Sequence, residues 1–166
     1  YGGTAVCRGR GERVECVHVP GRFFYVVVFP RIRISTAEVY TVLRSEGDYP
    51  SRPRKADEVI QILKRGNTNT SALKRRLFNR LEHVVLRCFP ALRLIKERIE
   101  RIGGDGFILT GSGSTFFKPV ATEGGGFQEA ERLKRSPVLK NCDVFSCIGN
   151  LRGEYHGNHG SEVNNS

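Results

Sequence analysis

The chain has 166 residues, of which 39% are hydrophobic and 27% are charged, and its formal net charge is +10. That length and composition fit one domain of ordinary size. No apolar run approaches the ~18 residues of a membrane-spanning helix. Residues 1–15 lack the layout of a secretory signal, so we expect a cytoplasmic protein without a membrane anchor. Because the sequence begins with tyrosine rather than methionine, we do not take residue 1 as the natural start.

A β-hairpin and a buried strand are predicted at the start of the chain. Residues 1–7 and 13–19 read as short strands, and the glycines within 8–12 favour a tight turn between them. Residues 22–29 form an unbroken aromatic and β-branched run, which is typical of a strand buried on both faces or nearly so. Pro30 ends this strand.

Helical patterns follow. Ser35-Thr36 offers an N-cap for a short helix that runs to Leu43, and we expect Thr36 to be a capping residue. Residues 44–55 contain two prolines and a glycine and predict a loop. Helical periodicity then resumes and ends at Gly66, a typical C-cap.

Two further helical stretches are predicted before the sequence returns to strands. One begins at Ser71 and keeps its 3.6-residue pattern as far as Cys88. The next starts at Pro90, where a missing N–H has no cost, and ends at Gly103-Gly104. Its apolar face carries Leu92, Ile95, Ile99 and Ile102.

The last third of the chain predicts strands around a glycine-serine loop. Strands are expected over 105–110, 115–120 and 144–148, a glycine-rich loop over 121–126 and a helix over 127–135. Residues 150–166 have almost nothing to bury and predict a disordered tail. The whole pattern is α+β, an antiparallel sheet with helices packed on one face.

The glycine-serine loop is the first candidate site. Gly111, Ser112, Gly113 and Ser114 stand between two apolar runs. Glycine lets the backbone turn sharply and approach a ligand closely, and exposed N–H groups in such a loop can cradle an anion. A plain hairpin turn is the alternative reading of these four residues.

The cysteines do not predict a disulfide framework. Their number is odd and their spacing is irregular, which favours reduced thiols. The five lie at positions 7, 16, 88, 142 and 147. Cys142 and Cys147 with His156 and His159 form a weak zinc pattern, because the two histidines are spaced too tightly. We therefore expect no metal site.

Basic residues are concentrated in the middle of the chain. Residues 51–101 contain 14 Lys or Arg against 5 Asp or Glu, a surplus of 9. Such a surplus favours an anionic partner, although a solvated helix face is the commonest reason for it. The region has few aromatic residues for base stacking, so nucleic acid is the less favoured partner. A non-enzymatic module that binds RNA or DNA stays open as an alternative.

Four segments, in the same order, resemble the C-terminal part of the GHMP small-molecule kinases. They are Gly-Gly-Thr-Ala at 2–5 with 9–12, Ser-Thr-Ala-Glu-Val-Tyr at 35–40 after Phe29-Pro30, Asn-Arg-Leu-Glu at 79–82 with 89–92, and 110–115 with Phe117. The resemblance covers residues 1 to about 135. It implies a ferredoxin-like C-terminal domain at 21–149, a hairpin at 1–20 from the end of the N-terminal domain, and the tail at 150–166.

The motifs look most like those of family members that use ATP with Mg²⁺ to phosphorylate the 2-hydroxyl of 4-diphosphocytidyl-2-C-methyl-D-erythritol. The resemblance implies that Tyr40 stacks on the cytosine. It also implies that Thr36 lies beside Tyr40 as a substrate-binding residue, which is the alternative to its capping role. It also implies that the loop at 111–114 lines the active site near the transferring phosphate. We expect the ring of Tyr40 and this loop to face one shared cleft. A helix-side packing residue is the other reading of Tyr40.

Some family features are absent from the sequence. The glycine-rich ATP loop ahead of a helix has no counterpart, and the catalytic Asp and substrate-binding Lys of the family would fall before Tyr1. The resemblance thus implies no catalytic residue in this chain and no activity without an N-terminal domain. Arg80 and Ser114 replace a usual acid and a usual proline. Another GHMP kinase, of the homoserine, mevalonate or galactose type, and a degenerate or truncated product without activity remain alternatives.

Overall fold

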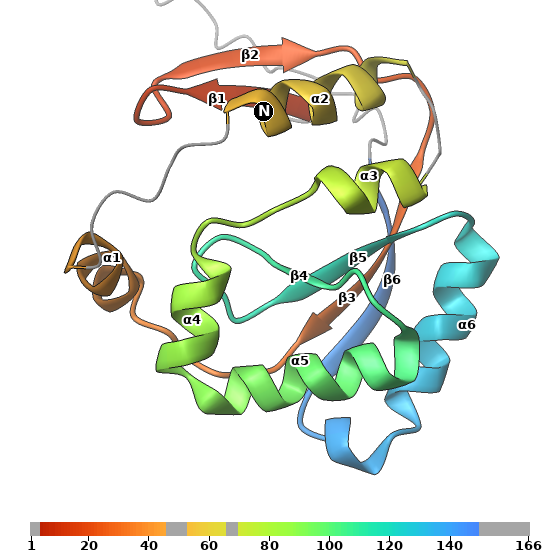
Figure 1. Ribbon diagram of the computed structural model, residues 1–166. Coiled ribbons are helices and arrows are strands. Elements are labelled where there is room, and N and C mark those ends of the chain that lie inside the picture. The colour runs from red at the N-terminus through yellow and green to blue at the C-terminus, as the bar shows by residue number, and fades with distance from the viewer. Residues whose placement is uncertain (1–3, 46–52, 66–69, 150–166) are drawn as a thin grey trace, which may run out of the picture.

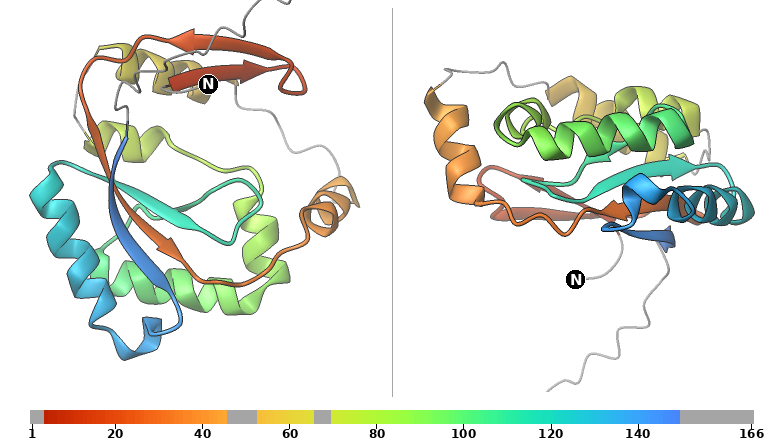
Figure 2. Two further views of the ribbon diagram at one scale, coloured as in Figure 1. Left: turned by 180° about the vertical axis from the view of Figure 1, so that it is seen from behind. Right: turned by 90° about the horizontal axis from the view of Figure 1, so that it is seen from below.

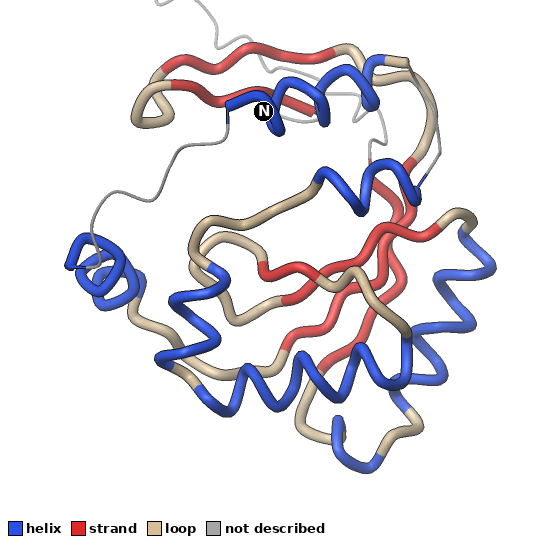
Figure 3. The backbone as a smooth tube through the Cα atoms, viewed as in Figure 1, coloured by secondary structure: helices blue, strands red, loops and turns tan. Residues whose placement is uncertain are grey.

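The computed structural model describes residues 4–45, 53–65 and 70–149 (Figure 1). The elements are β1 (Thr4–Arg8), β2 (Arg13–Val17), β3 (Phe23–Phe29), α1 (Thr36–Ser45), α2 (Pro53–Lys64), α3 (Thr70–Arg76), α4 (Glu82–Cys88), α5 (Pro90–Gly103), β4 (Ile108–Leu109), β5 (Phe116–Val120), α6 (Glu123–Lys134), η1 (Pro137–Leu139) and β6 (Asp143–Gly149). Over these residues, strands β1 to β3 are followed by helices α1 to α5, and strands β4 to β6 then enclose α6 and the short turn η1 (Figure 3).

The main sheet has four strands in the order β4-β5-β3-β6, and every neighbouring pair is antiparallel. Strand β3 is central, because its Val27 lies opposite Phe117 of β5 on one side and Phe145 of β6 on the other. The helices α5 and α6 connect strands in a β-α-β-β-α-β succession, which is the ferredoxin-like arrangement. The predicted α+β class is confirmed.

Helices cover one face of this sheet. Val26 and Val28 of β3 are fully buried and share a core with Val85 of α4, Leu92 of α5 and Leu133 of α6. Figure 2 shows α4 and α5 above one side of the sheet. The unbroken apolar sequence of β3 predicted a strand buried on both faces or nearly so. In the structure, the face that carries Val26 and Val28 is the more deeply buried one.

The opposite face is more open. Phe145 is 49% exposed and Phe29 is 40% exposed, and both side chains belong to the face that carries Val27. An apolar run in sequence does not distinguish a strand with two covered faces from one whose second face stays partly open.

The hairpin of β1 and β2 forms a second, smaller layer with α2 and α3. Its core centres on Val17, Val19, Phe23 and Leu73, against which Val59 and Ile60 of α2 pack. The predicted hairpin is confirmed, with Gly9 and Gly11 at positive φ in the turn. The division of the chain at residue 20 into two domains remains a prediction.

The predicted glycine-rich loop at 121–126 is wrong, because α6 begins at Glu123. The side chain of Thr122 caps the helix by accepting a hydrogen bond from the N–H of Gly125 at 3.0 Å. Gly126 lies against the sheet, where a Cβ would stand 2.9 Å from Ser146 Oγ and 3.0 Å from Val120 Cγ2. Glycine is thus needed here for close packing rather than for a turn.

Other predicted boundaries also differ from the structure. The loop predicted over 44–55 is too long, because α1 ends at Ser45 and α2 begins at Pro53. The helical stretch expected from Ser71 to Cys88 is divided into α3 and α4, with an irregular segment at 77–81 that is fixed by the side chain of Asn79. The strand expected over 105–110 contains only β4, since Gly106 adopts a positive φ of 104°. Helix α5 begins at Pro90 and ends before Gly104, as predicted. Gly66 and the tail at 150–166 lie outside the described residues.

Candidate functional site

The glycine-serine loop is a tight turn between β4 and β5. The N–H of Thr110 donates to the carbonyl of Thr115 at 2.8 Å, and the N–H of Gly113 donates to the carbonyl of Thr110 at 2.8 Å. Gly111 and Gly113 have positive φ values of 50° and 96°, a region that side chains with a Cβ rarely adopt. The glycines therefore determine the course of the loop.

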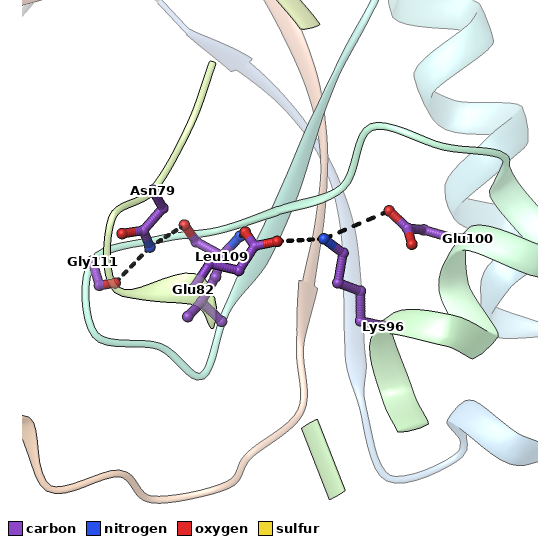
Figure 4. A network of polar contacts seen from close by, with 6 residues as sticks. All are labelled: Asn79, Glu82, Lys96, Glu100, Leu109 and Gly111. Atoms are coloured by element: carbon purple, nitrogen blue, oxygen red, sulfur yellow. Dashed lines mark hydrogen bonds and ion pairs between the residues drawn. The ribbon is translucent and has the colours of Figure 1, made fainter. Parts of the chain in front are cut away.

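Side chains from the segment before α4 and from its first turn hold the start of this loop (Figure 4). The amide Nδ2 of Asn79 donates to the carbonyls of Leu109 and Gly111, both at 2.7 Å. Glu82 accepts a hydrogen bond from the N–H of Leu109 at 2.8 Å through Oε2. Its other oxygen, Oε1, forms an ion pair with Lys96 of α5. Residues far apart in the sequence are thereby joined at the loop.

Lys96 connects this site to the far end of α5. Its ammonium group also lies 3.8 Å from Glu100, one turn later on the same helix. Burial raises the pKa of Glu100, and Lys96 acts in the opposite direction. The Glu82–Lys96 pair is largely shielded from water, with side chains 17% and 19% exposed, so it is screened less than a surface pair.

The loop reaches the N-terminus of α1. The hydroxyls of Thr36 and Ser112 share a hydrogen bond of 2.8 Å. A Cβ at Gly113 would lie 2.7 Å from Ile34 Cδ1, so the loop backbone also touches the segment that leads into α1. The expected capping role of Thr36 is wrong. Ser35 caps this helix instead, accepting from the N–H of Glu38 at 3.3 Å, and Thr36 is left to face the loop.

Tyr40 lies one helical turn after Thr36, on the same side of α1. Its side chain is 43% exposed, whereas its neighbour Val39 is fully buried. The structure therefore brings Thr36 to the loop and leaves the side chain of Tyr40 exposed one turn further along α1. A cleft shared by this ring and the loop remains a prediction.

Ser114 differs from the other loop residues in being buried, with an exposed fraction of 4%. Among the described residues, its hydroxyl has no hydrogen-bond partner. A buried hydroxyl without a partner is destabilising by about 1–3 kcal/mol. Gly111, in contrast, is exposed, and Ser112 and Gly113 are half-buried. The three loop positions that a ligand can reach are thus 111, 112 and 113.

Sequence reasoning proposed the loop, Thr36 and Tyr40 as site residues, which stays a prediction, but it missed the contacts of Asn79 and Glu82 with the start of the loop and of Lys96 with Glu82. One signal was present for Asn79. An Asn just before a helix often bonds a backbone N–H two residues on, and Oδ1 of Asn79 accepts from the N–H of Leu81 at 2.9 Å. Nothing in the spacing pointed to Lys96, because its partner is 14 residues away on another helix.

The described residues offer no metal centre and no membrane-spanning helix. There, no group of three His, Cys, Asp or Glu side chains is placed to hold a metal ion, and His156 and His159 lie outside this part of the chain. All five cysteines are unpaired. None of the helices within 4–45, 53–65 and 70–149 has the length and hydropathy of a membrane span.

Comparison with known proteins finds relatives over most of the chain. A 4-diphosphocytidyl-2-C-methyl-D-erythritol kinase of Shouchella clausii is 37% identical over 123 residues, which cover 74% of this chain and 40% of that protein. The kinase of the same name from Geobacillus kaustophilus is 38% identical over 158 residues, covering 94% and 50%. The chain thus spans about half the length of the curated relatives it matches. No family model matches it.

Solved structures of kinases share the fold of this chain. A 4-(cytidine 5′-diphospho)-2C-methyl-D-erythritol kinase superimposes with a TM-score of 0.62 and 28% identity, over 87% of this chain and 49% of that one. The chain belongs to the GHMP kinase family. Its fold is also that of a second GHMP kinase, the homoserine kinase from Cytophaga hutchinsonii, with a TM-score of 0.63 and 16% identity over 91% and 49% of the two chains. The resemblance noted in the sequence is confirmed.

Proposed function

We propose that this chain is the C-terminal, substrate-binding half of an ATP-dependent kinase that phosphorylates the 2-hydroxyl of 4-diphosphocytidyl-2-C-methyl-D-erythritol in non-mevalonate isoprenoid synthesis. One observation carries the proposal. The hydrogen bond between Thr36 and Ser112 joins two sequence motifs that are 76 residues apart. Both motifs belong to the segments that resemble GHMP kinases, and relatives that match 74% and 94% of the chain carry this kinase name.

In this proposal the two sides of the site have different roles. Tyr40 stacks its exposed ring on the cytosine. Stacking is suited to this role because every base presents a flat π-face to an aromatic ring. Gly111, Ser112 and Gly113 line the region of the methylerythritol unit and the transferring phosphate. Phosphoryl transfer depends mainly on positioning and on stabilising the charge that develops, so a fixed loop with N–H and hydroxyl donors is suited to it.

ATP and Mg²⁺ fit this part of the kinase poorly. The loop at 110–115 leads into a strand rather than a helix, so it lacks the helix N-terminus on which many nucleotide phosphates lie. The described residues also provide no cluster of acidic side chains for Mg²⁺. We therefore assign ATP, its metal and the catalytic Asp to the part of the relatives that this chain does not match. The protein is proposed to be cytoplasmic, in keeping with its five unpaired cysteines.

The proposal is tested by titrating cytidine diphosphate into the 166-residue chain and following backbone amide and aromatic ring signals by NMR. We expect shifts at Gly111, Ser112 and Gly113 and at the ring protons of Tyr40. Tyr40→Ala should weaken binding about 5- to 150-fold, since stacking contributes about 1–3 kcal/mol per base. Tyr40→Phe keeps the ring and should bind nearly normally. Phe127→Ala removes an aromatic ring that is 59% exposed and serves as the matched control.

Different ligands separate the alternatives. Shifts with homoserine or mevalonate, but none with cytidine diphosphate, would assign the chain to another GHMP kinase. The basic surplus in 51–101 supports the second candidate, a nucleic-acid-binding module. That reading requires binding of random-sequence RNA or DNA that weakens steeply with salt. We also expect the isolated chain to show no ATP-dependent phosphorylation of the substrate, and measurable turnover would contradict the assignment of catalysis to another segment.

A further inference from the structure

Strand β4 lies at the edge of the main sheet, so half of its backbone groups have no neighbouring strand. In an antiparallel pair, successive residues direct their N–H and C=O groups to opposite sides. Thr110 directs its N–H toward β5, where it bonds Thr115. The N–H and C=O of Leu109 consequently face outward. They bond the side chains of Glu82 and Asn79 in place of a strand.

The amide of Asn79 fits its position in only one orientation. Its NH₂ group faces two carbonyl oxygens, those of Leu109 and Gly111, and its own oxygen accepts from the N–H of Leu81. An aspartate has the same shape and retains the bond to Leu81. However, it places an oxygen against two carbonyl oxygens, where it has no hydrogen to donate. The site therefore requires an amide at this position.

We infer that Asn79 and Glu82 are positioning residues that set the direction in which the loop at 111–114 leaves β4. This inference rests on the proposed function, in which that loop contacts the substrate. Fixing the backbone of Leu109 and Gly111 directs the turn toward α1, where Ser112 meets Thr36. Lys96 supports the arrangement, since its ion pair holds the carboxylate of Glu82 in place.

The test uses amide hydrogen exchange and cytidine diphosphate titration on the 166-residue chain with Asn79→Asp. We expect exchange of the Thr110 and Gly113 amides to accelerate about tenfold or more, because two hydrogen bonds are lost and a repulsion is added. The core amide of Val26 should keep its protection, and the affinity for cytidine diphosphate should fall. Asn141→Asp makes the same chemical change at an exposed position outside the site and serves as the control.

Glu82 provides an independent pair of variants. Glu82→Leu removes the acceptor of the Leu109 N–H, whereas Glu82→Gln retains one carbonyl oxygen for it. We expect Glu82→Leu to accelerate loop exchange as Asn79→Asp does, and Glu82→Gln to restore most of the protection. These two variants decide the question if Asn79→Asp does not fold.

The outcomes separate the inference from the proposed function. Unchanged loop exchange in both Asn79→Asp and Glu82→Leu overturns the inference. An equal loss of protection in the core also overturns it, because the two residues would then support the whole fold. A loop that exchanges faster while the affinity for cytidine diphosphate stays unchanged overturns it as well. If the unmodified chain shows no binding of cytidine diphosphate, the proposed function fails. The exchange data then still decide whether the two side chains hold the loop.

Discussion

Lys118 is a buried cation in the middle of strand β5. Removing the side chain that neutralises it tests how much this ion pair contributes to the stability of the fold. Its side chain is only 4% exposed and pairs with Glu129 of α6, which is 13% exposed. The ammonium group also donates to the carbonyl of Gly103 at 2.5 Å and lies 4.9 Å from the ring centre of Phe107. The contact with Glu129 is an ion pair with Oε1, an oxygen that makes no hydrogen bond of regular geometry among the described residues.

Glu129→Leu should destabilise the protein by about 3–5 kcal/mol, because it leaves a buried charge without a counter-charge. The carbonyl of Gly103 and the ring of Phe107 remain but carry no full negative charge. A second cation is close by, since burial first and Lys118 second lower the pKa of Lys74, while Glu129 acts in the opposite direction. Loss of Glu129 therefore also removes the group that offsets the repulsion between the two lysines.

Urea unfolding monitored by circular dichroism measures this effect. With a slope of ~2 kcal/mol per molar urea, the midpoint should fall by roughly 2 M. The double variant Lys118→Met with Glu129→Leu should recover nearly all of the loss, since apolar replacement of both partners is often neutral or stabilising. Glu131→Leu, which breaks an exposed pair on the same helix, should cost less than ~1 kcal/mol. A Glu129→Leu midpoint equal to that of the control would refute the reasoning.

Two further predictions concern packing and pH. Gly124→Ala should stabilise α6 by about 0.5–1 kcal/mol, because nothing lies within 4 Å of the added Cβ. Gly126→Ala should instead lower the melting temperature, because its Cβ collides with the sheet, and an increase would contradict the packing described here. The Arg31 hydrogen bond lowers the pKa of Asp143 below its ordinary value of 3.8. The stability from this pair is therefore fully present above pH 3.8 and is lost as the pH falls through the lowered pKa of Asp143. The urea midpoints of the parent and of Asp143→Asn should differ at pH 7 and converge near pH 2.

Local sequence signals were reliable where the chain's own chemistry decides the structure. Pro90 begins α5 and Gly104 ends it, because a missing N–H and a positive φ act within one turn of a helix. The same signals failed at 124–126, where three glycines suggested a loop. In the structure, Thr122 caps a helix there and Gly126 is required by contact with Val120. That contact joins β5 to α6 across space, and no spacing rule reveals it.

The candidate site shows the same division between local and distant causes. Glycines at 111 and 113 permit the turn, and this much is written in the local sequence. The direction of the turn depends on Asn79 and Glu82, which lie 32 and 27 residues from the backbone groups of Gly111 and Leu109 that they bond. Since Asn79 lies in the segment that leads into α4 and Glu82 in its first turn, any change that displaces this turn should move the loop with it. The position of the loop then depends on how α4 packs against α1 and α5. The geometry of the candidate site is therefore set by the core as much as by the loop sequence.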